Sequence, residues 1–289
     1  MKKKIILGSA NFDQSYGVKK NFINKKEIKK ILNFAARNNV KSIDTSPLYN
    51  KSEKIIGLLN NHRFNIITKI PPKPKKIKKN NINKWLQKTV MQSLKNLKIK
   101  KFDCLLLHSA DSLLSKDGDE FYKCIKNIKK DKLTNRIGLS IYDFNILGKI
   151  LKRFKFDIVQ VPLNIFDQRL LETGWLRKLK NRKMEIHVRS IFMQGILLLK
   201  SSQLPKKLKK LNKHWLLWDQ WLKKNKLNSL KACVSFISNQ NHIDGVVVGC
   251  NNKNQLKQIL KLRQKKNYFS LPNLKIINTK LIDPREWAN

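Results

Sequence analysis

The run Phe102-Asp103-Cys104-Leu105-Leu106-Leu107-His108 decides the fold. Its centre is continuously apolar, as is Val246-Val247-Val248 near the C-terminus, and strands that are buried on both faces of a parallel sheet have this composition. A polar residue ends the run, and a stretch of helical period follows it. The run is therefore interpreted as one β-strand of a βα unit.

The same alternation extends along the whole chain. Apolar residues recur with helical period between the strand-like runs, for example at Ile28, Ile31, Leu32 and Ala35. We expect strands at 5–9, 40–44, 65–69, 102–108, 136–140, 157–161, 185–190 and 245–249, and helices at 26–38, 53–60, 84–97, 121–130, 144–154, 170–182, 228–239 and 254–260. Eight βα units in about 250 residues are typical of a closed (β/α)8 barrel. The G-x-G-x-x-G of a doubly wound dinucleotide-binding sheet is missing from the first turn.

We expect a single barrel domain over residues 1–289, with an extra helical segment at about 204–226 and a tail at about 275–289. In the extra segment, Trp215, Trp218 and Trp221 recur every three residues, which is typical of a helix face packed on the barrel. Pro71-Pro72-Lys73-Pro74 cannot continue a helix or a strand ladder, so a loop is predicted after the third strand.

The charge of the chain is strongly positive. Its 289 residues include 63 Lys and Arg against 19 Asp and Glu, a net charge of +44, and 41% are hydrophobic, which is enough for a buried core. The electrostatic field of such a positively charged protein attracts polyanions such as nucleic acids. The lysines, however, are scattered and interleaved with Asn and Ile, whose codons are also rich in A and T. A compositional bias explains this pattern, and no specific nucleic-acid partner is predicted.

Cysteine spacing and hydropathy exclude further classes of protein. Cys104, Cys124, Cys233 and Cys250 lie far apart without a C-x-x-C pair, so neither a zinc site nor a disulfide framework is indicated. The N-terminal apolar run is too short for an export signal, and no apolar stretch approaches the roughly 18 residues that span a bilayer. We expect a soluble, cytoplasmic protein without a membrane partner.

Polar residues end three consecutive strands of the predicted barrel. Asp44, Lys69 and His108 follow the second, third and fourth strands, where barrels of this kind carry their chemistry. Each alone is compatible with a cap, a solvated amine or a core imidazole. Tyr49, in the loop after Asp44, is a fourth member of this group and a candidate general acid, because a nearby ammonium such as that of Lys69 would lower the pKa of its phenol.

In this order and spacing the sequence resembles the aldo-keto reductase superfamily. Asp44, Tyr49, Lys69 and His108 match its tetrad residue by residue. Other segments agree with the resemblance, which runs from about Leu7 to the C-terminus: Leu7-Gly8-Ser9-Ala10, Ser52-Glu53, Gly57, Gly138-Leu139-Ser140 and Val246-Val247-Val248-Gly249.

The resemblance implies a nicotinamide cofactor across the barrel mouth and hydride transfer to a carbonyl carbon, with Tyr49 as the general acid. It implies that the carboxamide is bound by Ser140 and Gln160, and that the adenosine phosphate lies at 249–258. The chain departs from the family at Ile141, where a carboxamide-binding Asn is expected, and at Arg189, where an aromatic residue commonly stacks on the nicotinamide. The resemblance assigns cofactor binding to these positions: Ser140, Gln160, Arg189, Ser190, Gly195, Gly249, Asn251, Lys253 and Gln258.

The turn after the eighth strand bears on the choice of nucleotide. Lys253 and Lys257 supply positive charge near a predicted helix start, which favours a 2′-phosphate, although Gln255 replaces an Arg that is often found in relatives. We expect NADP rather than NAD, by roughly tenfold.

The resemblance also implies where a small carbonyl substrate binds. Candidate residues are Asn11, Phe12 and Tyr16 after the first strand, Asn164, Phe166, and Trp287 in the tail. Trp287 is equally compatible with a simple tail anchor. Tail and first-loop motifs are similar to those of bacterial members associated with sugar metabolism. The alternative to an enzyme is a barrel that binds nicotinamide nucleotides as a regulatory module with little turnover.

Overall fold

The computed structural model describes residues 3–13, 23–59, 63–263 and 269–287. In these ranges eight parallel strands close into a barrel in chain order, and β1 pairs with both β2 and β8. The (β/α)8 fold predicted from the sequence is confirmed. The strands are β1 (Lys4–Gly8), β2 (Ser42–Asp44), β3 (Asn65–Ile70), β4 (Phe102–Leu107), β5 (Thr134–Ser140), β6 (Ile158–Pro162), β7 (Glu185–Arg189) and β8 (Gly245–Val248).

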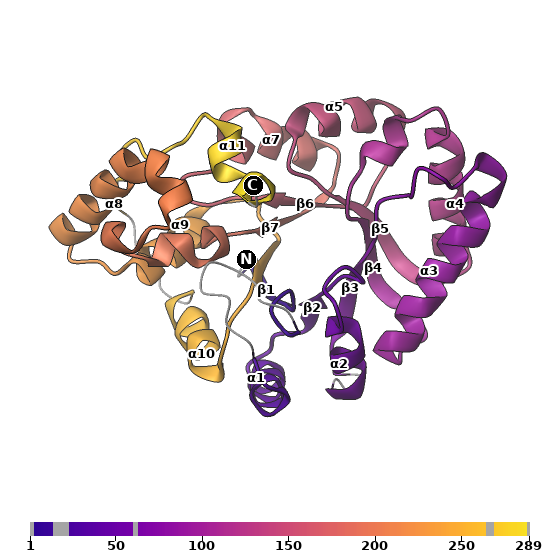
Figure 1. The fold of residues 1–289 in the computed structure, drawn as a ribbon, viewed down its shortest axis with the longest axis horizontal. Coiled ribbons are helices and arrows are strands. Elements are labelled where there is room, and N and C mark those ends of the chain that lie inside the picture. Colours follow the sequence, from indigo (N-terminus) through magenta and orange to yellow (C-terminus); the bar gives the residue numbers. More distant parts are fainter. Residues whose placement is uncertain (1–2, 14–22, 60–62, 264–268, 288–289) are drawn as a thin grey trace.

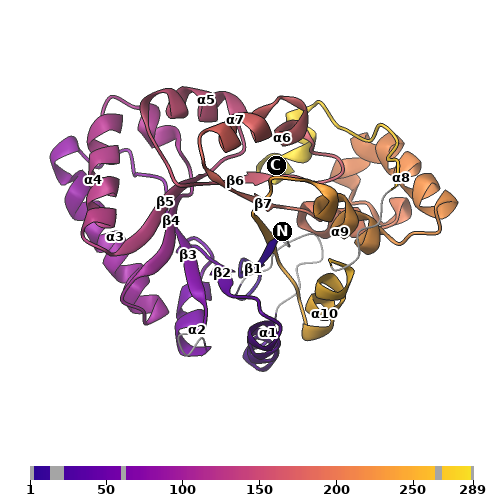
Figure 2. The ribbon, with the colours of Figure 1, turned by 180° about the vertical axis from the view of Figure 1, so that it is seen from behind.

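Helices surround the barrel on the outside (Figures 1 and 2). They are α1 (Lys25–Arg37), α2 (Ser52–Leu59), α3 (Ile82–Leu97), α4 (Gly118–Lys130), α5 (Phe144–Arg153), α6 (Arg169–Glu172), α7 (Trp175–Asn181), α8 (Asn212–Lys224), α9 (Ser229–Asn239), α10 (Lys253–Leu262) and α11 (Thr279–Ile282). Short 3-10 helices lie at Lys79–Asn81, Asp111–Leu114, Met193–Leu198, Ser201–Gln203, Lys206–Leu211 and Pro284–Trp287. Within the described residues, no helix combines the length and the apolar character that crossing a bilayer requires.

Alternation along each strand divides the core into two parts. On β1, Ile5 and Leu7 belong to the large cluster between strands and helices, whereas Ile6 belongs to a smaller cluster with Ile67 and Ile158. Successive side chains of a strand point to opposite faces, so the smaller cluster fills the barrel interior. The interior is therefore packed, and a ligand must bind at one end of the barrel rather than inside it.

One helix prediction is wrong. The predicted helix at 170–182 is divided into α6 and α7, because Gly174 adopts a left-handed conformation with φ of 71° between them. Glycine reaches this region without steric cost and interrupts the helix there.

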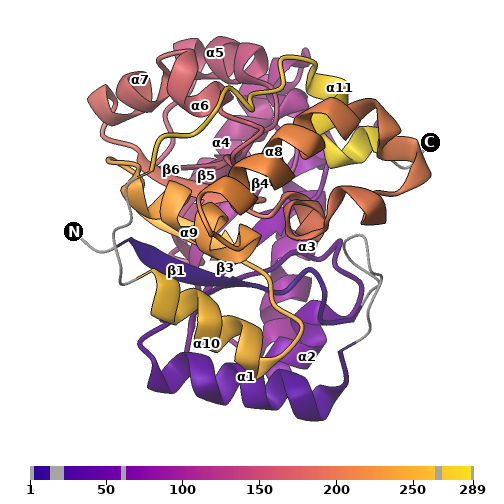
Figure 3. The ribbon, with the colours of Figure 1, turned by 90° about the vertical axis from the view of Figure 1, so that its left-hand side faces the viewer.

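The extra segment forms the 3-10 helix Lys206–Leu211 followed by α8. Trp215, Trp218 and Trp221 of α8 are buried, and the rings of Trp218 and Trp221 stack with centroids 5.5 Å apart. The tail forms α11 and a last 3-10 turn, drawn in yellow in Figure 3, and α11 contacts the 3-10 helix Lys206–Leu211 that precedes α8.

Candidate active site

A cavity of about 400 Å³ lies where the carboxyl ends of the strands meet. Its walls include the last residues of five strands and the loops that follow them. The strand-end lining residues are Gly8, Asp44, Ser140, Arg189 and Val248. The barrel topology therefore brings residues that are far apart in the sequence to one opening.

Asp44 and Lys69 form a buried ion pair at this opening. Lys69 Nζ donates to Asp44 Oδ1 at 2.6 Å and to the Thr45 carbonyl at 2.9 Å. Gln160 Nε2 donates to the other carboxylate oxygen, Oδ2, at 2.8 Å. The side chains of the pair are only 1% and 5% exposed, and burial lowers the pKa of the Lys69 ammonium while the charge of Asp44 opposes that change. Lys69 itself does not line the cavity and supports it from behind.

Tyr49 lines the cavity above this pair. Lys69 Nζ lies 5.0 Å from the centroid of the Tyr49 ring, and the rings of Tyr49 and His108 meet edge to face with centroids 5.8 Å apart. The sequence expectation that Lys69 lowers the phenol pKa is wrong for this state of the protein. Burial raises the Tyr49 pKa, and the negative charge of Asp44 raises it further, while the charge of Arg189 opposes the rise. Tyr49 therefore keeps its proton at neutral pH.

His108 lines the cavity next to Tyr49. Its Nδ1 lies 3.0 Å from Ser46 Oγ, and that oxygen also accepts a hydrogen bond from the Leu48 N–H. The Ser46 hydroxyl hydrogen is thus available to Nδ1, which favours a proton on Nε2. Burial, together with the charge of Lys69, lowers the pKa of His108 to about 3. The imidazole is neutral at physiological pH and can donate one hydrogen bond.

The cavity wall also contains an unpaired polar group and two glycines that leave room for an extended ligand. Gln160 Oε1 is buried and has no hydrogen-bond partner within the described chain, so an acceptor is available beside Ser140. Gly195 and Gly249 also line the cavity, and a Cβ added at either glycine would meet nothing within 4 Å of the described residues. An elongated ligand could pass close to the backbone at both glycines. Ser190 lies in the same wall.

The loop after β7 has an unusual backbone. Ser190, Met193 and Gln194 have positive φ angles of 58°, 49° and 56°, and Gly195 follows with 89°. Non-glycine residues rarely adopt this region, and such strain gathers at ligand sites. The loop is held at its start by Asn164, whose Nδ2 donates to the Ser190 carbonyl at 3.1 Å. Asn164 is thus a loop anchor here rather than a lining residue.

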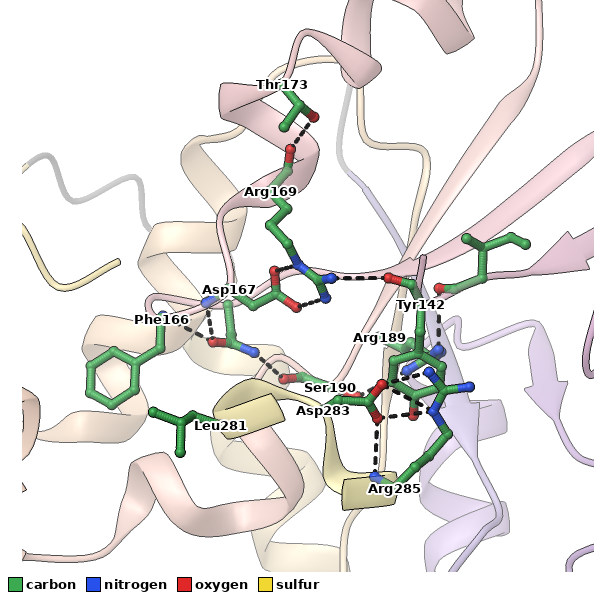
Figure 4. A network of polar contacts seen from close by, with 12 residues as sticks. Tyr142, Phe166, Asp167, Arg169, Thr173, Arg189, Ser190, Leu281, Asp283 and Arg285 are labelled. Atoms are coloured by element: carbon green, nitrogen blue, oxygen red, sulfur yellow. Dashed lines mark hydrogen bonds and ion pairs between the residues drawn. The ribbon is translucent and has the colours of Figure 1, made fainter. Parts of the chain in front are cut away.

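Arg189 lines the cavity, and Figure 4 shows it beside Tyr142, Asp283 and Arg285. Its Cζ lies 3.8 Å from the centroid of the Tyr142 ring, and the Cζ of Arg285 lies 4.1 Å from the same centroid. Asp283 pairs with Arg285 and not with Arg189. Arg189 makes two long contacts, of 3.4 Å each, to Ser190 Oγ and the Ile141 carbonyl, and forms no ion pair with a carboxylate of the described residues.

The predicted substrate residues separate into two groups. Asn11 lines the cavity, and its Nδ2 donates to the Cys250 carbonyl and to Asn251 Oδ1, both at 2.9 Å. Phe12 and Trp287 do not line the cavity, because both side chains pack into the hydrophobic core. Trp287 therefore matches the tail-anchor alternative. Phe166 is also buried in the core, and Tyr16 lies outside the described residues.

The turn after β8 contributes part of the expected cofactor set. Asn251 and Gln255 line the cavity with Gly249, whereas Lys253 and Gln258 are exposed on α10 and do not line it. The Lys253 N–H donates to the carboxylate of Glu27, at 2.9 Å.

Sequence reasoning missed several residues of this site. Ser46, Tyr142 and Gln194 are polar members, and Ile191, Phe192, Leu198 and Leu199 form an apolar wall. Ser46 and Tyr142 follow β2 and β5 directly, so a wider search after each strand would have found them. The apolar wall comes from the segment after β7, which includes the 3-10 helix Met193–Leu198 and has no periodic signal in the sequence.

Comparisons with known proteins agree with the barrel fold. The sequence profile of the aldo/keto reductase family matches residues 4–270. No curated protein matches the chain.

Two solved structures share the fold at low sequence identity. An aldo-keto reductase from Bacillus halodurans in its holo form is 18% identical, with 92% of this chain and 88% of that chain covered and a TM-score of 0.69. A glycerol dehydrogenase from Gluconobacter oxydans is 17% identical, with 93% and 88% covered and a TM-score of 0.69. Because the family profile covers residues 4–270 of 289 and the fold is the expected barrel, this chain belongs to the aldo/keto reductase family.

Proposed function

We propose that this protein is an NAD(P)-dependent oxidoreductase that reduces an aldehyde or ketone to an alcohol. The observation that supports the proposal most strongly is the arrangement of Tyr49 beside the buried Asp44–Lys69 pair and a neutral His108. Family membership supports oxidoreductase chemistry on carbonyl compounds. A small-molecule carbonyl is the substrate class, and a sugar-derived carbonyl is a member of that class. We place the enzyme in the cytoplasm, where reduced nicotinamide nucleotides are available.

Tyr49 acts as the general acid. Its raised pKa keeps the phenol protonated, so a proton is present to be transferred from Oη to the carbonyl oxygen of the substrate. The phenolate that forms carries a full negative charge, and the Lys69 ammonium near the ring stabilises it. Asp44 and the Thr45 carbonyl hold that ammonium in place.

His108 orients the carbonyl. A neutral imidazole with its proton on Nε2 donates a hydrogen bond to the carbonyl oxygen without competing with Tyr49 for the role of acid. Ser46 fixes the ring from behind. The two donors together determine where the oxygen lies.

The cofactor-side residues bind and orient the nucleotide. Gln160 Oε1 and Ser140 are positioned for a carboxamide, while Ser190, Gly195 and Gly249 allow the rest of an extended molecule to lie against the backbone. The bound nicotinamide nucleotide supplies the hydride. Ile191 and Phe192 add an apolar surface that limits water at the reacting carbon.

Arg189 favours substrates with an acidic group. Its guanidinium lies in the cavity wall, forms no ion pair within the described residues, and lies close enough to change the pKa values of Tyr49, Lys69 and His108. A cation that no direct ion pair neutralises attracts a carboxylate or phosphate on the ligand. We therefore propose an anionic carbonyl compound.

Oxidation of NADH and of NADPH, followed with a panel of neutral and anionic aldehydes, ketones and keto-sugars, tests this proposal. Turnover that is lost in Tyr49→Phe supports it. Tight nucleotide binding without turnover on any carbonyl class would instead support the regulatory barrel.

A further inference from the structure

We propose that Glu27 determines which nicotinamide nucleotide the protein uses, by placing a carboxylate where the 2′-phosphate of NADPH would bind, so that NADH is preferred. The inference rests on the proposed function in requiring that a nicotinamide nucleotide occupies the cavity with its carboxamide beside Ser140 and Gln160 and its adenosine end at the turn after β8. It reverses the preference that the lysines after the eighth strand predict.

Glu27 belongs to α1, but its carboxylate accepts a hydrogen bond from the first turn of α10. It is the third residue of α1, and its N–H donates to the N-cap Asn24 at 2.9 Å. A Glu at this position commonly returns its carboxylate to the N-cap of its own helix. Here Oε1 accepts instead from the Lys253 N–H at the first turn of α10, 2.9 Å away. Helices α1 and α10 lie side by side in Figures 1 and 3, which makes this contact between two helices direct.

Two further N–H donors of this turn are also engaged. The Asn251 N–H donates to Gln255 Oε1 at 2.8 Å, and the Gln255 N–H donates to Asn252 Oδ1 at 2.9 Å. The first N–H groups of a helix attract anions when they are unpaired. At α10, side chains of the protein satisfy three N–H groups around the helix start, and one of those side chains is itself an anion.

This turn continues the wall of the cavity. Gly249, Asn251 and Gln255 line it, and the space beside Gly249 is open. A nucleotide that extends along this wall brings its adenosine end to the start of α10. A 2′-phosphate would add about two negative charges next to the Glu27 carboxylate. A ribose with free hydroxyls would instead present donors that a carboxylate can accept.

The positive charge near this turn does not cancel Glu27. Lys30 pairs with Glu27 at 3.5 Å, so its charge is partly used within α1. The hydrogen bond from the Lys253 N–H lowers the pKa of the Glu27 carboxyl, so the group is ionised at neutral pH. Lys253 and Lys257 have exposed side chains, and their attraction for a phosphate is screened by salt.

Dissociation constants of NADH, NADPH, 5′-AMP and 2′,5′-ADP, measured by calorimetry or fluorescence titration, test the inference. The variants are Glu27→Gln, which keeps an oxygen acceptor and removes the charge, and Glu27→Lys. Asp131→Asn is the matched control, because Asp131 is an exposed acid at the end of α4, far from α10 (Figure 1). Thermal unfolding of each variant reports whether the loss of the α1–α10 contact changes the fold.

We expect the wild type to bind NADH about tenfold or more tightly than NADPH, since a carboxylate whose charge Lys30 offsets only in part opposes the phosphate. Glu27→Gln should reduce this ratio about tenfold, Glu27→Lys should invert it, and Asp131→Asn should leave it unchanged. The same order should hold for 5′-AMP against 2′,5′-ADP, which isolates the adenosine end.

A wild-type preference for NADPH, or a ratio that folded Glu27 variants leave unchanged, would overturn the inference. Failure of the proposed function has a different signature. In that case neither nucleotide binds in the micromolar range, or both bind and no carbonyl is reduced.

Discussion

Replacing Asp44 by Asn should destabilise the protein severely, because the Lys69 ammonium would remain buried without its counter-charge. The two charged atoms are 2.6 Å apart and both side chains are almost fully buried. At an effective dielectric constant of about 20, the Coulomb attraction over this distance is about 6 kcal/mol. Much of this attraction offsets the cost of removing two charges from water, so the net value of the pair is small. A variant that lacks one partner loses the Coulomb attraction, while the free-energy cost of removing the remaining charge from water is unchanged.

We therefore expect Asp44→Asn and Lys69→Met each to lower the free energy of unfolding by about 3–5 kcal/mol. The double variant buries no charge at this point and should be more stable than either single variant. Urea unfolding of the four proteins at neutral pH gives the coupling energy, which we expect to exceed about 2 kcal/mol. The exposed pair Arg153–Asp119 provides the control cycle, with an expected coupling below about 1 kcal/mol. Additive effects of Asp44→Asn and Lys69→Met would refute the view that the pair is a coupled, buried unit.

Three further predictions concern single residues of the cavity. Tyr49→Phe should lower kcat at least about a hundredfold and leave nucleotide affinity unchanged, since only the acidic proton is lost; single-turnover hydride transfer at the wild-type rate would contradict this. The folded pKa of His108 is about 3 against about 6.5 when unfolded, so the unfolded chain binds more protons between these values and stability falls as the pH drops through this window. Urea midpoints of His108→Gln should therefore decline less over that pH range than those of the wild type. Arg189→Met should raise KM for succinic semialdehyde about tenfold while that for pentanal stays within about threefold; equal changes for both aldehydes, with weaker nucleotide binding, would show that the guanidinium contacts the nucleotide instead.

The residues of the barrel rim could be predicted from the sequence because the fold makes their positions simple. In a parallel barrel all strand ends meet at one opening, so Asp44, Lys69 and His108 were expected to converge as soon as their strands were identified. The distances between them confirm that convergence for Asp44 and Lys69. Their catalytic roles remain proposals.

The direction of side chains outside the strands could not be predicted in the same way. Phe12 and Trp287 carry the same chemistry whether they face a cavity or the core, and packing of distant segments placed them in the core. Glu27 and Lys253 are 226 residues apart, and only the packing of α1 against α10 brings them together. The local pattern of each helix contains no trace of this contact.

The seam between β1 and β8 has a consequence for the synthesis of the chain. Asn11 donates to the Cys250 carbonyl across 239 positions of sequence, and β1 has no second neighbour until β8 exists. The ribosome synthesises Tyr49, Lys69 and His108 early, whereas β8, the strand that closes the barrel, is the last strand to emerge. A nascent chain therefore carries the reactive side chains before it has an enclosure for a nucleotide, and both edges of its growing sheet stay open to pairing until β8 closes the ring.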